Sequence, residues 1–430
     1  MIYYQEPGGR REFFLLLLAA TFVFLNAITL SLVLAGQILL RHLAVPLIWL
    51  GLMALTHFLL NRYRPFRDPF LLPLVALLTG WGMLLQERLA PNFMWRQTLW
   101  LALSAAAFLV IAIVPRNLRW LRRYRYTWLT LGLLLLLATI AAGVNPSGLP
   151  IARYWLSLPF VSQVFFQPSE LLKLLLVVFL ASYFHEREKQ FEAGEPRNWW
   201  WRLAYLGPLL LMWGFCLILL VWQRDLGAAA LFFILFLALL YLATGNQGYV
   251  LGGMILLLAA GVLAYFAFDV VALRVDAWWD PWPEADNRAF QIVQSLYAVA
   301  AGGLLGQGIG QGFPDYIPVV HSDFAFAAIA EEWGIFGALV VILCFALLAY
   351  RGLRLAYLTQ QPFSRYLAAG IVILLSAQAF LIMGGVTKFL PLTGVTLPFI
   401  SYGGSSLLMS WVMVGLLMYL SGEGHTQQEV

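Results

Sequence analysis

The chain has 430 residues, of which 62% are hydrophobic, 15% aromatic and only 11% charged, whereas about a quarter of the residues of a soluble globular protein carry charge. With a mean hydropathy of +0.82, a soluble fold is excluded and an integral membrane protein is predicted. The formal net charge of +5 does not indicate nucleic acid binding, because the cytoplasmic loops of a membrane protein carry an excess of basic residues.

Twelve apolar runs are long enough to be transmembrane helices. A helix needs about 20 apolar residues to cross a bilayer, and continuous runs argue against a β-barrel, whose strands would alternate. The first run follows Arg10 and Arg11 but is too long for a secretion signal, so we expect it to remain as an anchor. The expected spans are residues 14–36, 43–61, 69–86, 98–115, 126–144, 169–184, 205–222, 226–243, 249–268, 324–350, 366–385 and 403–421.

The distribution of lysine and arginine between these spans predicts the orientation. If the N-terminus is cytoplasmic, seventeen of the 26 basic residues fall on the cytoplasmic side, eight fall on the outer side, and Lys173 lies inside a span. Because the cytoplasmic side of a membrane protein holds the basic excess, both termini are predicted to be cytoplasmic.

A polar segment at residues 167–173 opens the sixth span. Pro168 and Ser169 are typical of a helix start, and Glu170 and Lys173 are three residues apart and so share a helical face. Charged residues within a membrane span are costly and indicate a functional site. An ion pair that only ties helices together is the alternative.

A second polar segment, residues 223–227, separates the seventh and eighth spans. It contains Arg224 and Asp225, which we consider candidates for a site at the outer surface. A tight outer turn without a function explains the segment equally well.

The connection between the ninth and tenth spans, about 269–323, is the largest outer loop. It holds seven of the 21 acidic residues, and ordered loops of this length are usually functional. Aromatic residues are spread through it, which argues against disorder. We expect an interfacial helix followed by turns.

The end of this loop carries the third polar segment. His321, Ser322 and Asp323 stand where the chain re-enters the membrane, and Glu331 and Glu332 follow within the tenth span. The paired glutamates favour a function. The alternative, compatible with a function, is that Ser322 or Asp323 caps the helix.

Two glycine-rich segments accompany this loop. Residues 302–312 contain six glycines, but no predicted strand precedes them and no Lys-Ser/Thr follows, so a nucleotide site is not indicated. Residues 396–406 are polar and glycine-rich just before the last span; they suggest a site, or alternatively tight packing of small residues. The two cysteines and five histidines form no metal-binding motif.

Taken in order, these segments resemble the SEDS family of bacterial cell-wall proteins, the group of RodA, FtsW and SpoVE. The resemblance covers about residues 66–421. The matching sequences are QPSE-x-x-K at 167–173, QPDLG at 223–227 with Arg224 in place of proline, HTDFIFA at 321–327 with Ser322 in place of threonine, EE-x-G at 331–334, and LPxxSYGGSS at 397–406.

The resemblance implies a SEDS-type bundle of ten core spans and a peptidoglycan glycosyltransferase in the bacterial cytoplasmic membrane. Such an enzyme polymerises lipid II at the outer face, releases undecaprenyl diphosphate and inverts the anomeric centre, usually with a class B penicillin-binding protein as partner. Asp323 matches the family's essential acid, and a positioned carboxylate can accept the proton of the attacking sugar hydroxyl.

The same resemblance suggests residues that bind the substrate. The departing lipid diphosphate is already a stable anion and needs positive charge more than an acid. Lys173, Arg153 and Arg274 are the first candidates for that charge. Further candidates are Glu170, Arg224, Asp225, Asp315, Gln291, Ser401 and Ser405.

The chain departs from the family at its beginning and in its first outer loop. Residues 1–65 are predicted to add a membrane hairpin of two helices before the core at 66–421, and 422–430 a cytoplasmic tail. Tyr154 stands where the family has an arginine, with Arg153 one position earlier, so Arg153 need not take over that arginine's role.

Several alternatives stay open. A transporter of lipid-linked sugars would also use charges within the membrane, and a scaffold for wall-synthesis partners would need no chemistry. No cofactor is evident, although the sequence leaves a divalent cation open. The segment 394–398 leans toward the division type without separating division from elongation.

Overall fold

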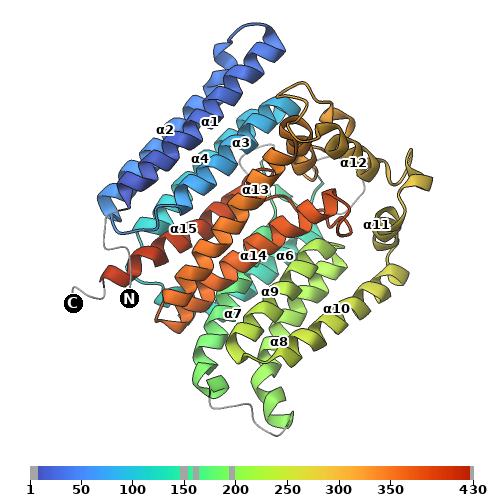
Figure 1. The fold of residues 1–430 in the computed structure, drawn as a ribbon. Helices are drawn as coiled ribbons and strands as arrows, with labels where there is room; N and C mark the ends of the chain where they lie inside the picture. The colour runs from blue at the N-terminus through green and yellow to red at the C-terminus, as the bar shows by residue number, and fades with distance from the viewer. Residues whose placement is uncertain (1–7, 146–153, 158–163, 193–198, 427–430) are drawn as a thin grey trace. The chain divides into compact units, whose positions relative to one another are not determined.

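The computed structural model describes residues 8–145, 154–157, 164–192 and 199–426 (Figure 1). Arg153 therefore lies outside the described residues. The chain divides into two compact units. The first unit comprises residues 1–114, 261–351 and 378–430, and the second comprises 115–260 and 352–377. Each is described by itself.

The helices of the first unit are joined by loops, and no strand is found in its described part. Its elements are α1 (Gly9–Ala35), α2 (Leu40–Tyr63), α3 (Leu71–Leu89), η1 (Pro91–Phe93), α4 (Met94–Ile113), α11 (Asp269–Trp279), η2 (Trp282–Glu284), α12 (Phe290–Gly302), η3 (Pro314–Tyr316) and α15 (Gly404–Thr426). The outer loop contains the expected helix as α11 and a second helix as α12, while the interfacial position expected for the first stays a prediction. In this unit α15 packs on α4, and α1 packs on α2 and α3.

The second unit surrounds a buried helix. Its elements are α5 (Arg119–Arg123), α6 (Arg125–Ala142), β1 (Leu156–Ser157), β2 (Phe165–Phe166), α7 (Pro168–Glu192), α8 (Trp199–Trp222) and α9 (Leu226–Thr244). The two short strands are antiparallel, with Leu156 opposite Phe166. Helix α7 packs against α6 and α9, which explains why its apolar stretch is mostly buried. Both units share α10 (Gln247–Ala267), α13 (Ala325–Leu358) and α14 (Pro362–Val386).

The predicted all-α polytopic membrane fold is confirmed, and every one of the twelve apolar runs coincides with a helix. Ten helices in the described part of the chain are long and apolar enough to cross a membrane. Helix α3 is not among them, since Gln86, Glu87 and Arg88 lower its mean hydropathy, and the apolar stretch described in α8, Leu209–Trp222, is shorter. Twelve spans and cytoplasmic termini stay predictions.

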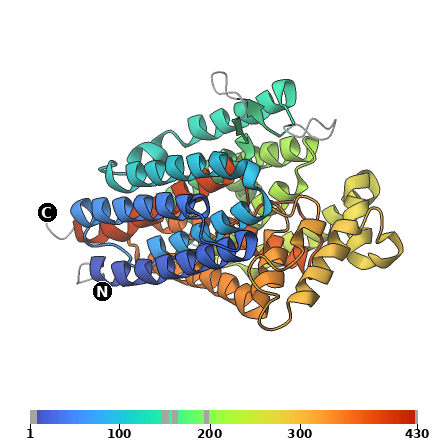
Figure 2. The ribbon, with the colours of Figure 1, turned by 90° about the horizontal axis from the view of Figure 1, so that it is seen from above.

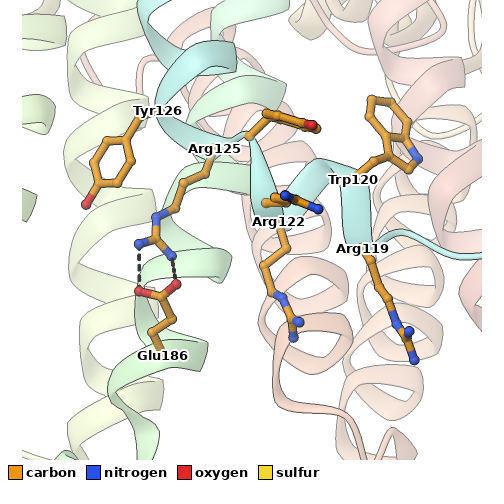
Figure 3. Close-up of a pocket in the computed structure, with 8 residues that line it drawn as sticks. Arg119, Trp120, Arg122, Arg125, Tyr126 and Glu186 are labelled. Atoms are coloured by element: carbon orange, nitrogen blue, oxygen red, sulfur yellow. Dashed lines mark hydrogen bonds and ion pairs between the residues drawn. The ribbon is translucent and has the colours of Figure 1, made fainter.

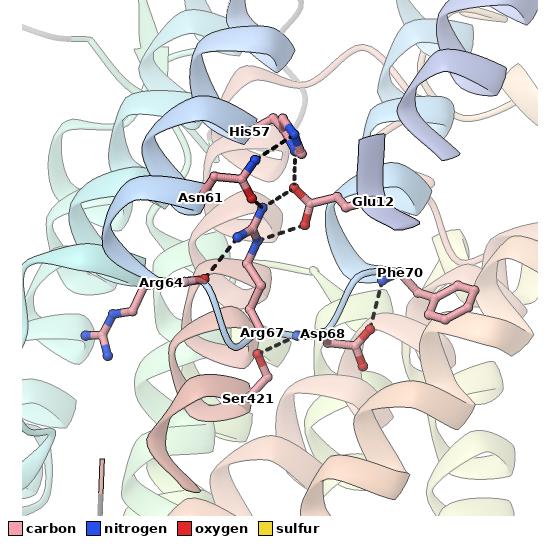
Figure 4. A network of polar contacts seen from close by, with 8 residues as sticks. All are labelled: Glu12, His57, Asn61, Arg64, Arg67, Asp68, Phe70 and Ser421. Carbon is pink, nitrogen blue, oxygen red and sulfur yellow. Dashed lines mark hydrogen bonds and ion pairs between the residues drawn. The ribbon is translucent and has the colours of Figure 1, made fainter. Parts of the chain in front are cut away.

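The N-terminal hairpin, α1 and α2, is anchored by a buried polar network. The two helices lie side by side in both views of the fold (Figures 1 and 2). Arg67, just after α2, donates two hydrogen bonds to the Glu12 carboxylate of α1, at 2.6 and 2.8 Å, and a third at 2.8 Å to Asn61 (Figure 4). His57 bonds to Glu12 at 2.7 Å. Because buried charges are costly unless they are paired and hydrogen-bonded, this network fixes the hairpin on the segment that begins the core.

The next residue, Asp68, ties the same segment to two later helices. Its carboxylate pairs with Arg351 of α13 at 2.7 Å, and its backbone amide donates to the Ser421 hydroxyl of α15 at 3.1 Å. The junction between the hairpin and the core is therefore bonded to α1 through Arg67 and to α13 and α15 through Asp68.

Candidate active site

The predicted catalytic acid, Asp323, lies in the turn just before α13. The residue is partly exposed, and its carboxylate accepts a hydrogen bond from the Ser322 hydroxyl at 2.8 Å. Partial burial raises the pKa of Asp323, while the Ser322 hydrogen bond and the charge of Arg274 lower it, and burial has the larger effect. A raised proton affinity suits a group that must take a proton from a hydroxyl.

The capping alternative is not supported. Helix α13 begins at Ala325, so Phe324 occupies the cap position. The Ser322 hydroxyl instead donates to Asp323 and to the Val319 carbonyl.

The backbone before Asp323 is held by residues distant in sequence. The His321 carbonyl accepts hydrogen bonds from the Tyr402 amide at 2.8 Å and from the Gln86 side chain at 3.1 Å. The Ser322 carbonyl accepts one from the Ser401 hydroxyl, which in turn accepts from the Leu397 amide at 3.0 Å. The segment 397–402 thus fixes the turn that presents Asp323. Ser401, predicted to bind substrate, has a positioning role in this geometry.

Arg274 lies on α11, which is docked on the loop 388–394. Its guanidinium donates to the Thr393 carbonyl at 3.1 Å, and Trp278 donates to the Lys388 carbonyl at 3.1 Å. Gly394 is next to the guanidinium: its φ is +71°, and a Cβ there would lie 3.1 Å from Arg274 Nη2. A cation is therefore held close enough to Asp323 to affect its pKa.

Helix α13 is broken at Gly334, which has a φ of +68° and a ψ of −165°. The apolar run 324–350 gave no indication of this break. It frees the carbonyls of Glu331 and Glu332, which accept hydrogen bonds from the amides of Gln307 and Gly308 at 2.9 and 3.1 Å. Backbone polar groups at membrane depth must be paired, and the glycine-rich loop 302–312 pairs them.

The same loop also pairs the chain after the break. The amides of Ile335 and Phe336 donate to the carbonyls of Gly303 and Leu304 at 2.9 and 3.4 Å. The approach is too close for side chains: a Cβ on Gly306 would lie 2.2 Å from the Glu332 carbonyl oxygen. These glycines therefore serve backbone pairing, a structural role that the sequence did not indicate.

A charged cluster is attached to the break. Arg88 of α3 pairs with Asp315 at 2.9 Å, donates to the Gly312 carbonyl at 3.2 Å, and has its Nε 3.4 Å from Glu332 Oε1. Glu331 accepts a hydrogen bond from the Phe313 amide at 2.8 Å. Asp315, a predicted substrate-binding residue, thus stands in an ion pair. Arg88 was not among the predicted site residues, although a cation at the outer end of an apolar run could have indicated it.

An aromatic group borders the Asp323 turn. The rings of Phe93 and Tyr402 are stacked with centroids 5.0 Å apart, and the His321 ring lies 5.5 Å from Phe93 and 5.7 Å from Tyr402. Burial lowers the pKa of His321, which favours its neutral form. Arg96 lies over Phe93 at 5.7 Å. Of these four side chains only His321 and Tyr402 belong to segments that the sequence had marked.

The second unit contains the other predicted charged residues. Glu170 and Lys173 pair at 2.8 Å on the first turns of α7, both buried. Asp225 accepts a hydrogen bond from the Ala228 amide at 3.1 Å and caps α9. The exposed Arg224 has a φ of +62°, so the segment 223–227 forms the tight turn that was one of the two expectations.

The remaining candidates lie in the first unit. Gln291 is partly exposed on α12, and Ser405 is buried at the start of α15. The neighbouring Gly404 allows close packing, since a Cβ there would meet the indole of Trp100 at 2.1 Å. The first unit thus brings Asp323 together with Ser401 and Arg274. Among the described residues, no group of three His, Cys, Asp or Glu side chains could hold a metal ion.

Residues 69–426 match the family model FtsW/RodA/SpoVE, described as cell cycle protein. The chain is 36% identical over 398 residues to the peptidoglycan glycosyltransferase RodA of Mycobacterium leprae, covering 87% of this chain and 82% of that protein. It is 35% identical over 334 residues to the probable peptidoglycan glycosyltransferase FtsW of Geobacter metallireducens, covering 76% and 84%.

Two solved structures are also similar to this chain. A chain of a peptidoglycan synthase complex, studied for the coordination of polymerization and crosslinking, superposes with a TM-score of 0.69 at 26% identity, covering 83% of this chain and 98% of that one. A mutant of the rod shape determining protein RodA of Thermus thermophilus superposes with a TM-score of 0.59 at 25% identity, covering 83% of this chain and 97% of that one.

Proposed function

Since the chain belongs to the FtsW, RodA and SpoVE family and is a peptidoglycan glycosyltransferase of the cytoplasmic membrane, we propose that Asp323 is the general base of its reaction. The acceptor sugar's hydroxyl oxygen attacks the anomeric carbon of the donor lipid II, and its proton passes to the Asp323 carboxylate. The bond between that carbon and the diphosphate breaks, and undecaprenyl diphosphate leaves with the electron pair. Attack opposite the leaving group inverts the anomeric centre.

One observation carries this proposal: a partly exposed aspartate whose carboxyl has a raised pKa stands on a turn that distant residues hold. A base must be accessible to the hydroxyl, have sufficient proton affinity and be fixed in position. The contacts of His321 and Ser322 provide the fixed position. The Ser322 hydrogen bond to Oδ1 leaves Oδ2 as the natural acceptor for the proton.

The leaving diphosphate needs positive charge. Arg274 supports this role in the first unit, since its guanidinium is oriented by the Thr393 carbonyl. Lys173 supports it in the second unit as a buried ammonium that pairs with Glu170 at 2.8 Å. Charge-assisted hydrogen bonds to phosphate are strong, so both are proposed as diphosphate ligands, together with Arg224 and Arg153. Glu170, Asp225, Asp315, Gln291 and Ser405 are proposed to complete the substrate site.

A partner and a competing function follow from the same comparisons. The match to a chain of a peptidoglycan synthase complex supports a class B penicillin-binding protein as partner. The transporter alternative is not better supported, because the names of the curated relatives describe glycosyltransferases.

The test is polymerisation of lipid II by the purified chain with its class B partner. Asp323→Asn is expected to lower the rate by about 10²–10⁴-fold, the usual contribution of a general base. Asp286→Asn is the matched control, because it makes the same change at an exposed position of the same loop. Polymer formation by Asp323→Asn at the rate of the control would contradict the proposal. Equal thermal unfolding of the two variants excludes a folding defect.

A further inference from the structure

A basic pocket in the second unit contains none of the residues assigned to the reaction. It has a volume of about 630 Å³ and lies where α5 meets α6 (Figure 3). Four of its eight lining residues are arginines, at positions 119, 122, 123 and 125, and three are aromatic. Glu186 of α7 is the one acid among them.

The charges in this pocket are not balanced. Arg125 forms a two-pronged ion pair with Glu186, with contacts of 2.5 and 2.6 Å, so these two charges cancel. Arg122 lies 2.6 Å from His185 Nε2. Because a guanidinium only donates hydrogen bonds, that nitrogen is the acceptor and carries no proton, so His185 does not offset the charge of Arg122. Arg119 and Arg123 are exposed, which leaves three guanidinium charges without a carboxylate in the pocket.

The aromatic residues of the pocket are of the types that are common at a membrane surface. Trp120, Tyr124 and Tyr126 are 45%, 49% and 43% exposed, and Trp and Tyr concentrate at the level of lipid headgroups. Arg123 lies over the Tyr124 ring at 5.8 Å, and Arg125 lies over Tyr126 at 4.8 Å. The rings therefore both border the pocket and orient two of its guanidiniums.

The position of the pocket along the chain also agrees with a location at the level of the lipid headgroups. The candidate membrane span of α6 is Arg125–Ala142, so the pocket is at the end of a span. Residues 116–125 belong to the predicted cytoplasmic side. The need for cytoplasmic basic residues explains how many arginines the segment has. It does not explain why four of them line one pocket with three rings, because charges anywhere in the loop would set the orientation.

We infer that this pocket binds the headgroup of an anionic phospholipid of the cytoplasmic leaflet, preferentially one with two phosphates such as cardiolipin. The guanidinium fork matches phosphate oxygens in pairs, and basic pockets beside membrane helices on the cytoplasmic side are suited to such headgroups. Three unbalanced positive charges favour two phosphates over one. The exposed rings contact the glycerol and upper acyl region, which a soluble anion lacks.

The inference is tested with the full chain in nanodiscs of phosphatidylcholine containing a small fraction of cardiolipin, and the retained lipid is counted by native mass spectrometry after release from the nanodisc. The test variant is Arg119→Gln with Arg123→Gln, both exposed. The matched control is Arg62→Gln with Arg354→Gln, which removes two exposed arginines of the same predicted side outside the pocket. Cardiolipin binding is expected to fall about tenfold or more in the test variant and to remain in the control.

Parallel arms identify the ligand chemistry. Phosphatidylglycerol at the same total charge is expected to be retained more weakly than cardiolipin, and raised salt is expected to weaken both. Equal retention by the test and control variants would overturn the inference. So would wild-type protein that retains inorganic phosphate or an acidic peptide but no anionic lipid. Unchanged thermal unfolding of the test variant in zwitterionic lipid shows that any loss is not a folding defect.

Discussion

The chain contains two buried ion pairs with opposite architectures. In the first unit, Glu12 and Arg67 are fully buried, 55 positions apart, and share further hydrogen bonds with the hairpin. In the second unit, Glu170 and Lys173 are almost as buried but only three residues apart on one helix. The first pair joins separate elements, whereas the second joins none.

This difference indicates what each pair does. Burying two charges costs free energy that the attraction between them often fails to recover. For Glu12 and Arg67, the pairing fixes the N-terminal hairpin on the core. For Glu170 and Lys173, the pair lies within one turn of α7, and a buried ammonium in a membrane helix indicates a functional site, in keeping with the substrate role proposed for Lys173. Exchanging each pair for neutral side chains separates the two roles.

The largest effect on activity is expected from Glu170→Gln with Lys173→Met. Lipid II polymerisation should fall about 10²–10³-fold, because the change removes the cation that is proposed to bind the leaving diphosphate. Thermal unfolding should remain close to wild type, since replacing both buried charges leaves neither unpaired. Wild-type polymerisation by this variant would remove Lys173 from the proposed site.

The largest effect on stability is expected from Glu12→Gln. It leaves the Arg67 guanidinium buried without its carboxylate and should lower the free energy of unfolding by about 3–5 kcal/mol, measured by denaturation in detergent. Polymerisation per folded molecule should stay near wild type. The double change Glu12→Gln with Arg67→Met should lose less stability. If Glu12→Gln were fully stable but inactive, the Glu12 and Arg67 pair would serve the reaction and would not be needed to anchor the hairpin.

A smaller loss is expected from Ser401→Ala. The change leaves the Ser322 carbonyl and the Leu397 amide without their shared hydroxyl, a cost of about 1–3 kcal/mol, so kcat should fall about tenfold with little change in KM. Ser401→Thr retains a hydroxyl and should recover most of the rate. Ser104→Ala is the control, because that buried hydroxyl bonds only within its own helix turn. An increase in KM alone would instead make Ser401 a substrate ligand.

The smallest effect is a shift of the pH profile. Because burial raises the pKa of Asp323, the rate should begin to fall on acidification at a higher pH than an ordinary aspartate would give. The charge of Arg274 lowers that pKa, so Arg274→Gln should move the acid limb to still higher pH. The profiles are compared after each is normalised to its own maximum. A shift to lower pH would exclude the proposed pairing of these two charges.

The sequence predicted what depends on local composition. Apolar runs located the helices, and the segment 321–323 drew attention to Asp323 because polar residues at a membrane boundary are conspicuous. The contacts that hold this turn could not be predicted: Gln86 lies 235 positions from His321. The break in α13 was not predicted because residues 324–350 form one apolar run in the sequence. The amides that bond to the carbonyls freed by the break belong to the loop 302–312.

The most direct test of the central claim is single-turnover formation of the first glycosidic bond by Asp323→Asn, measured alongside lipid II binding. If Asp323 is the general base, binding should remain within about threefold of wild type while bond formation slows at least about 10²-fold. Bond formation at the wild-type rate would contradict the account. A slow rate that saturating lipid II restores would do so equally, since Asp323 would then be a binding residue.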